Sequence, residues 1–111
     1  MSQRLNLYQD MGGAHGLPIV VGLNYDAATG RELTQDDALR MTGLTLQQIS
    51  TQALKELHQE FGESVFTEGA EPKSDNYRTF IVGPYNVTFI FQAYQVVAYA
   101  AGMPEVSFER K

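Results

Sequence analysis

The clearest pattern along the chain is a helical one over residues 45–61. Apolar side chains recur there three or four positions apart and so share one face of a helix: Leu46, Ile49, Ala53, Leu57 and Phe61. Thr45 is suited to cap the start of this helix, and Gly62 is placed to end it in a left-handed cap. We therefore predict one main helix over residues 45–61.

A shorter helix is predicted just before it, over residues 34–41. Thr34 can act as its N-cap, and Asp36 and Asp37 stand in its first turn, where the helix dipole favours negative charge. Gly43 then interrupts the helical pattern, so the two helices are expected to be separate.

Segments with alternating or β-branched apolar residues predict five strands, over residues 4–10, 17–25, 78–82, 86–92 and 105–109. Gly83, Pro84 and Tyr85 join the third and fourth, which indicates a hairpin. The remaining long connections are residues 63–77, a polar loop, and residues 93–102, which suit a helical turn or a bulged crossing.

The order of these elements predicts the fold class. The strands are grouped and do not alternate with helices, an order typical of antiparallel sheets. We predict an α+β fold in which an antiparallel sheet carries the main helix and the short helix on one face. A chain of 111 residues has the length of one ordinary domain, so residues 1–111 are expected to form a single domain.

Composition narrows the classes of function. The chain has no cysteine, which excludes disulfides, thiolate metal sites and cysteine nucleophiles. Its net charge of −5 disfavours nucleic acid and would speed encounter with a cationic partner, although mild acidity also simply keeps a small domain soluble. No apolar run is long enough to span a bilayer, and residues 1–6 lack the apolar core of a signal peptide.

His15 is the first residue to consider for catalysis, because it stands in a glycine-rich segment and imidazole is the usual general base near neutral pH. Asp10 and Asp26 are the nearby acidic candidates, but a nucleophile elbow and a phosphate loop are both absent. His58 has no partner at metal-ligand spacing on its helix. We therefore expect no catalytic residue, no metal and no cofactor, with a structural role for His15.

Aromatic side chains are frequent in the last third of the chain. Val87, Phe89 and Phe91 alternate along one strand, so we expect them in the core. The tyrosines are expected to keep their hydroxyls at the surface. Tyr94 and Tyr99, together with His15 and Asp26, are the candidate binding residues.

Three separated segments of the chain resemble one bacterial domain family. The first carries Gly-Gly-Ala-His-Gly at residues 12–16, and the second carries Asp-Ala-Ala-Thr-Gly at residues 26–30. The third, residues 87–102, carries the pattern Phe-x-Phe-x-x-Tyr and is followed by a closing strand. The family is the domain at the C-terminal end of the lysozyme-sensing anti-sigma factor RsiV, which also occurs in the non-catalytic region of the peptidoglycan deacetylase PdaC.

The resemblance implies a cell-envelope domain that binds or senses without turnover, with a cationic protein such as lysozyme, or a cell-wall glycan, as partner. Family members usually carry a further segment before residues 12–16, so an RsiV-type domain lacking that segment is expected here. Met11 stands where the family usually has Thr, and Gln95 where it often has Glu, which weakens a site built on either position.

Two other functions stay open. One is a cell-wall polysaccharide hydrolase with His15 and Asp26 as acid and base. The other is a purely structural accessory domain. If the usual N-terminal segment of the family is missing, the strand over residues 4–10 or 17–25 lacks a neighbour, and its uncovered edge predicts a homodimer. The alternative is a monomer whose edge is covered by residues 63–77.

Overall fold

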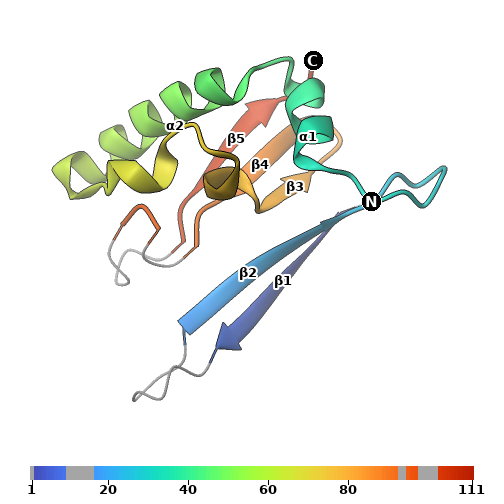
Figure 1. Ribbon diagram of the computed structural model, residues 1–111, viewed down its shortest axis with the longest axis horizontal. Helices are drawn as coiled ribbons and strands as arrows, with labels where there is room; N and C mark the ends of the chain where they lie inside the picture. The colour runs from blue at the N-terminus through green and yellow to red at the C-terminus, as the bar shows by residue number, and fades with distance from the viewer. Residues whose placement is uncertain (1, 10–16, 93–94, 98–102) are drawn as a thin grey trace.

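The computed structural model describes residues 2–9, 17–92, 95–97 and 103–111, with side chains from residue 21 onward. Its strands and helices are β1 (Ser2–Gln9), β2 (Leu17–Asn24), α1 (Gln35–Thr42), α2 (Leu46–Phe61), β3 (Phe80–Val82), β4 (Asn86–Ile90) and β5 (Glu105–Glu109). β3, β4 and β5 form an antiparallel sheet with β4 at its centre, and α1 and α2 cover one face (Figure 1). The predicted α+β class is confirmed.

Both helices begin with a reciprocal capping interaction, as their first residues predict. Thr34 Oγ1 accepts from the N–H of Asp37, and the Asp37 carboxylate accepts from the N–H of Thr34. Thr45 and Gln48 repeat this arrangement at the start of α2. Gly43, with φ 71° and ψ 14°, ends α1 in the left-handed conformation that glycine adopts without strain.

Gly62 ends α2, but it does not form the predicted left-handed cap. Its φ is 63° and its ψ is −134°, outside the left-handed helical region, while its N–H donates to the carbonyl of His58. The chain continues from there as a 3₁₀ turn, Gly62–Ser64. The prediction was therefore right that this position requires a residue tolerant of positive φ and wrong about the conformation.

The buried face of α2 is the one that its apolar spacing predicts. Ile49, Ala53 and Leu57 are at most 1% exposed and pack over the sheet. The segments around β4 and β5 contribute the buried side chains of Val87, Phe89, Phe91, Val106 and Phe108. The expectation that the first three of these lie in the core is confirmed.

Residues 63–77, predicted as a polar loop, are anchored to the core by Tyr77. They include 3₁₀ turns at Thr67–Ala70 and Ser74–Tyr77. The Tyr77 ring is fully buried, its centroid 5.6 Å from that of Phe89, and its hydroxyl donates to the carbonyl of Ala70 at 2.6 Å. Burial raises the pKa of Tyr77 to about 12. The expected surface hydroxyl is therefore wrong at this tyrosine, because Ala70 supplies a buried partner.

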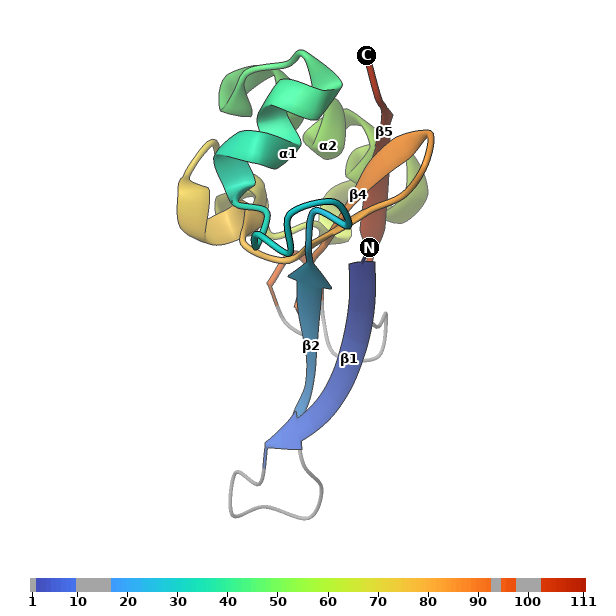
Figure 2. The same ribbon diagram turned by 90° about the vertical axis from the view of Figure 1, so that its right-hand side faces the viewer.

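β1 and β2 form a two-stranded antiparallel ribbon of their own, in register from Ser2↔Asn24 to Gln9↔Leu17. The ribbon projects from the body of the molecule (Figure 2). The radius of gyration, 14.4 Å, accordingly exceeds the roughly 13 Å typical of a chain of this length. The predicted strands are thus present, but they are divided between two sheets.

Candidate functional site

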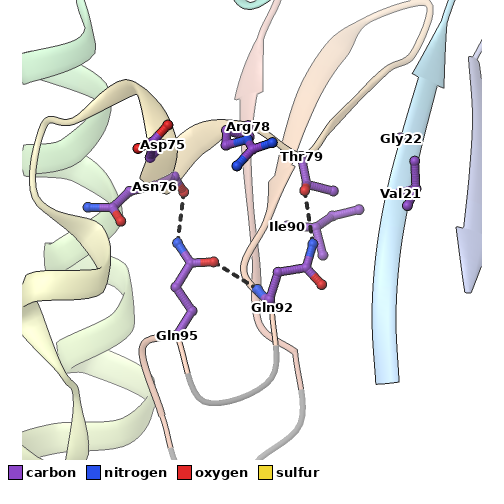
Figure 3. A pocket seen from close by; sticks show the side chains of 9 residues that line it. All are labelled: Val21, Gly22, Asp75, Asn76, Arg78, Thr79, Ile90, Gln92 and Gln95. Carbon is purple, nitrogen blue, oxygen red and sulfur yellow. Dashed lines mark hydrogen bonds between the residues drawn. The ribbon is translucent and has the colours of Figure 1, made fainter. Parts of the chain in front are cut away.

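Two adjoining pockets lie between β2 and the segment that leads into β3. The first, about 380 Å³ in volume, is bounded by β2, by residues 75–79 and by the chain around the end of β4 (Figure 3). The second, about 410 Å³, extends toward the start of α1. Gly22, Asp75 and Arg78 line both pockets. We call the two pockets together the Arg78 groove.

The groove exists because β2 approaches β3 closely at one end only. Gly22 makes this approach feasible, since a Cβ at that position would lie 2.2 Å from the carbonyl oxygen of Phe80. Two residues further on, the Asn24 side chain donates from Nδ2 to the carbonyl of Phe80 at 2.8 Å and accepts at Oδ1 from the N–H of Val82 at 3.0 Å. The buried carboxamide thus pairs with the edge of β3 much as a backbone amide would.

Gln95 fixes the wall of the first pocket. Its Oε1 accepts from the N–H of Gln92 at 2.9 Å, and its Nε2 donates to the carbonyls of Gly69 and Asn76, each at 2.8 Å. Figure 3 shows the bonds to Gln92 and Asn76 as part of one chain of contacts around the pocket. Each polar atom of this amide has a partner in the fold, so Gln95 shapes the pocket and is not available to a ligand.

The surface of the first pocket is mixed in character. The side chain of Gln92 donates from Nε2 to Thr79 Oγ1 at 2.9 Å, which leaves the Thr79 hydroxyl hydrogen able to donate elsewhere. Val21 and Ile90 contribute apolar side chains (Figure 3). The pocket therefore offers an apolar patch beside a hydroxyl donor.

Arg78 is exposed at the junction of the two pockets. The other arginines whose side chains are described all have partners: Arg31 and Arg40 contact Asp37, and Arg110 donates to the carbonyl of Gly83. Arg78 has no hydrogen-bond or ion-pair partner among the described residues. Its guanidinium is the one described arginine head group left to solvent or to a ligand.

Asp37 is the most strongly perturbed acid in the described part of the chain, and its surroundings are structural. The pKa of its carboxyl is held well below the usual range by the hydrogen bond from the backbone N–H of Thr34, and next by the Arg31 side chain. The same pairing raises the pKa of Arg31. With 5% exposure and partners on both oxygens, this carboxylate joins the residue 26–31 turn to α1 and is not placed to act on a ligand.

The residues singled out in the sequence lie mostly outside this groove. Asp26 accepts at Oδ1 from the N–H groups of Ala28 and Thr29, at 2.8 and 3.3 Å, and so holds the turn after β2. His15, Tyr94 and Tyr99 lie outside the described residues.

His58 is exposed on α2, with Nδ1 3.0 Å from the carbonyl oxygen of Gly62. The ranges that the structure describes contain no group of three or more His, Asp or Glu side chains able to hold a metal ion. Within the same ranges, no helix combines the length and the apolar character needed to cross a bilayer.

Sequence reasoning missed the residues that form the groove. Arg78 and Gln92 were included only as ends of predicted strands, whereas β3 begins at Phe80 and β4 ends at Ile90. The only sequence signal for this site was that Arg78 and Gln92 are polar residues at the two ends of a predicted hairpin. Their meeting with Gly22 depends on contacts across more than 50 positions, which no local pattern reveals.

Comparison with known proteins adds the family. The model of the family described as "Protein of unknown function (DUF3298)" matches residues 32–111, which excludes the β1–β2 ribbon. A curated relative, "Peptidoglycan-N-acetylmuramic acid deacetylase PdaC" of Bacillus subtilis (strain 168), is 28% identical over 109 residues, covering 95% of this chain. This chain spans 23% of the length of that protein. The family match takes in most of the chain, including both helices and the whole three-stranded sheet, and the chain therefore belongs to the DUF3298 family.

Proposed function

We propose that this chain is a non-catalytic binding domain of the bacterial cell envelope and that its ligand site is the Arg78 groove. The observation that carries the proposal is the uncommitted guanidinium of Arg78 at the junction of two pockets, in walls whose other polar groups largely serve the fold. The envelope setting is supported by the similarity to PdaC, whose name describes action on peptidoglycan.

A role without turnover is supported by the chemistry of the first pocket. No histidine is among its described lining residues. Thr79, the one hydroxyl-bearing residue among them, accepts a hydrogen bond from the amide of Gln92 and has no base as a partner among the described residues. A hydroxyl becomes a nucleophile through such a base, so this pocket is better suited to holding a ligand than to cleaving it.

Sedimentation with purified peptidoglycan sacculi tests the proposal. We expect the chain to deplete from the supernatant at physiological salt, with no release of acetate, reducing sugar or peptide in parallel assays. A chain that stays in solution at every sacculus concentration would remove the binding role. Accumulation of any of these products with time would replace it with an enzyme.

The hydrolase alternative assigns His15 and Asp26 as acid and base. The eight residues of β2 stand between them in the chain, and an extended strand of that length spans about 23 Å. Asp26 is also engaged by two backbone N–H groups of its own turn. If product release were nevertheless detected, Asp26→Asn would be expected to abolish it under this alternative and to leave it unchanged otherwise.

The overall charge supports a second candidate, a cationic protein partner such as lysozyme. A net charge of −5 would steer such a partner toward the chain, and the attraction would weaken with salt. Calorimetric titration against lysozyme at low and at moderate salt tests this. Absence of heat under both conditions would remove this partner and leave the groove as the sole basis for binding.

A structural accessory role is the remaining alternative, and it predicts an apolar patch for a neighbouring domain. The large apolar side chains exposed among the described residues are Tyr25, Phe66 and Tyr85. They belong to three different segments of the chain. The groove therefore supports a binding role more directly than these residues support a packing role.

A further inference from the structure

We propose that the ligand of the Arg78 groove carries a carboxylate and that Arg78 is its ion-pair partner. This inference rests on the function proposed above and adds the chemical class of the ligand. Guanidinium has a planar fork of N–H donors that matches the two oxygens of a carboxylate, which a lysine ammonium does not.

The state of the other described arginines supports this assignment. In an acidic chain a carboxylate partner is easily found, and Arg31 and Arg40 share Asp37. Asp75 lines both pockets with Arg78, but their side chains are not within the 4.0 Å of an ion pair. Arg78 thus lies at the groove without an ion-pair partner among the residues that the structure describes, and binding a carboxylate there breaks none of the described ion pairs.

Asp75 limits what else the ligand can carry. A second negative charge placed toward this side of the groove would meet a like charge, which disfavours polyanions such as polyphosphates. The groove is therefore suited to a ligand with one carboxylate and an otherwise neutral body.

The rest of the first pocket indicates the nature of that body. Thr79 offers a hydroxyl donor, while Val21, backed by the nearly buried Ile90, offers an apolar surface of the kind that receives a methyl group. A volume of about 380 Å³ is at the small end for ligand pockets and suits one sugar or one dipeptide unit. An N-acetylated sugar acid and an N-acylated dipeptide with a free C-terminal carboxylate share these features, and both kinds of group occur in a peptidoglycan.

Nuclear magnetic resonance titration of the labelled chain distinguishes these sources. The probes are N-acetylmuramic acid, its neutral counterpart N-acetylglucosamine, which lacks the lactyl carboxylate, and the dipeptide N-acetyl-alanyl-alanine, whose C-terminal carboxylate is its only charge. We expect at least one acidic probe to shift the amide signals of Gly22, Arg78 and Thr79, and N-acetylglucosamine to bind at least about tenfold more weakly.

Three variants separate local recognition from overall charge. Arg78→Gln should weaken binding of the acidic probe by about 10- to 100-fold. Arg78→Lys should weaken it less, because lysine keeps the charge but lacks the paired N–H donors of guanidinium. Lys55→Gln removes the same charge from the exposed side of α2 and should bind as the unmodified chain does. Arg78 is exposed and has no described partner, so its variants should keep the thermal midpoint of the unmodified chain.

Each of several results would overturn the inference. These are equal binding of the two sugars, unchanged binding by Arg78→Gln, an equal loss in Lys55→Gln, or no response to either acidic probe at tens of millimolar. If the chain then still sediments with sacculi, the envelope-binding function stands with a neutral ligand. If it does not sediment either, both proposals fail.

Discussion

Gln95 holds three backbone groups at once in this chain, and neither a shorter side chain nor a carboxylate could make all three bonds. It accepts from one N–H and donates to two carbonyls on different segments of the chain. Gly69 complements it, because a Cβ on that residue would lie 1.8 Å from the carbonyl oxygen of residue 95. The amide therefore specifies how residues 66–76 pack beside the end of β4.

Replacing Gln95 by Glu should test this directly. A carboxylate offers no donor and would face the carbonyls of Gly69 and Asn76, so we expect a loss of about 1–3 kcal/mol in the free energy of unfolding at pH 7. The same repulsion would raise the pKa of the new carboxyl, and protonation restores one donor, so the deficit should shrink as the pH falls toward 4.5.

Urea unfolding of both proteins at the two pH values measures this change. Gln95→Met, which cannot titrate, is the matched control and should show a deficit that does not vary with pH. A Glu variant that is equally stable at both pH values, or as stable as the unmodified chain at pH 7, would mean that Gln95 does not bridge these carbonyls.

Asp37 predicts a second pH dependence, of ordinary acid type. Its folded pKa is lowered, so the stability that it contributes is fully present above the unfolded value of about 3.9 and is lost as the pH falls below that value. The difference in unfolding free energy between the unmodified chain and Asp37→Asn should be constant from pH 7 to about 5 and narrow below about 4. A gap that is unchanged at pH 3 would show that the ionised form has no advantage in the folded state.

At the scale of elements, local periodicity was enough wherever a segment's neighbours in sequence determine its structure. The spacing of Ile49, Ala53 and Leu57 identified the buried face of α2, and β5 was predicted with its observed bounds, Glu105–Glu109. The predictions failed where contacts with residues distant in the sequence determine the structure. The burial of Tyr77 depends on the rings of Phe89 and Phe91, and β2 contacts β3 at Phe80 without joining the three-stranded sheet.

Leu57→Ala should measure how far the sheet relies on α2. Leu57 is 1% exposed at the centre of the core, so its truncation should cost about 2–5 kcal/mol in chemical unfolding. Leu54 lies one turn earlier and is only half-buried, so Leu54→Ala should cost clearly less. A loss below about 1 kcal/mol at Leu57, or equal losses at both sites, would contradict this account of the buried face.

At the scale of the molecule, a ribbon joined to a layered body creates both the groove and an open edge. In the two-stranded sheet, β1 pairs with β2 alone, so the backbone groups on its other side have no strand partner among the described residues. Such an edge favours pairing with another chain unless something covers it. The sequence predicted the strands, but the location of the open edge could be seen only in the assembled fold.

We therefore expect a homodimer related by a two-fold axis, formed as the protein concentration rises into the high micromolar range. Light scattering across a dilution series measures the mass directly. A monomer mass that persists throughout the series would mean that the edge of β1 is protected in solution.

The pairing of Asn24 with β3 also has a consequence for the order of folding. β1 and β2 are neighbours in sequence, whereas Asn24 bonds to Phe80 across 56 positions. We therefore expect the two strands to pair early in folding and to contact β3 later. Undocking should be a partial opening that leaves the core closed. The N–H of Val82 donates a hydrogen bond to Asn24 Oδ1, so Asn24→Ala should speed hydrogen exchange at this N–H. Exchange at the N–H of Val87, in the core, should stay slow. A ligand held between ribbon and body would reverse this effect by making the docked form the one that persists.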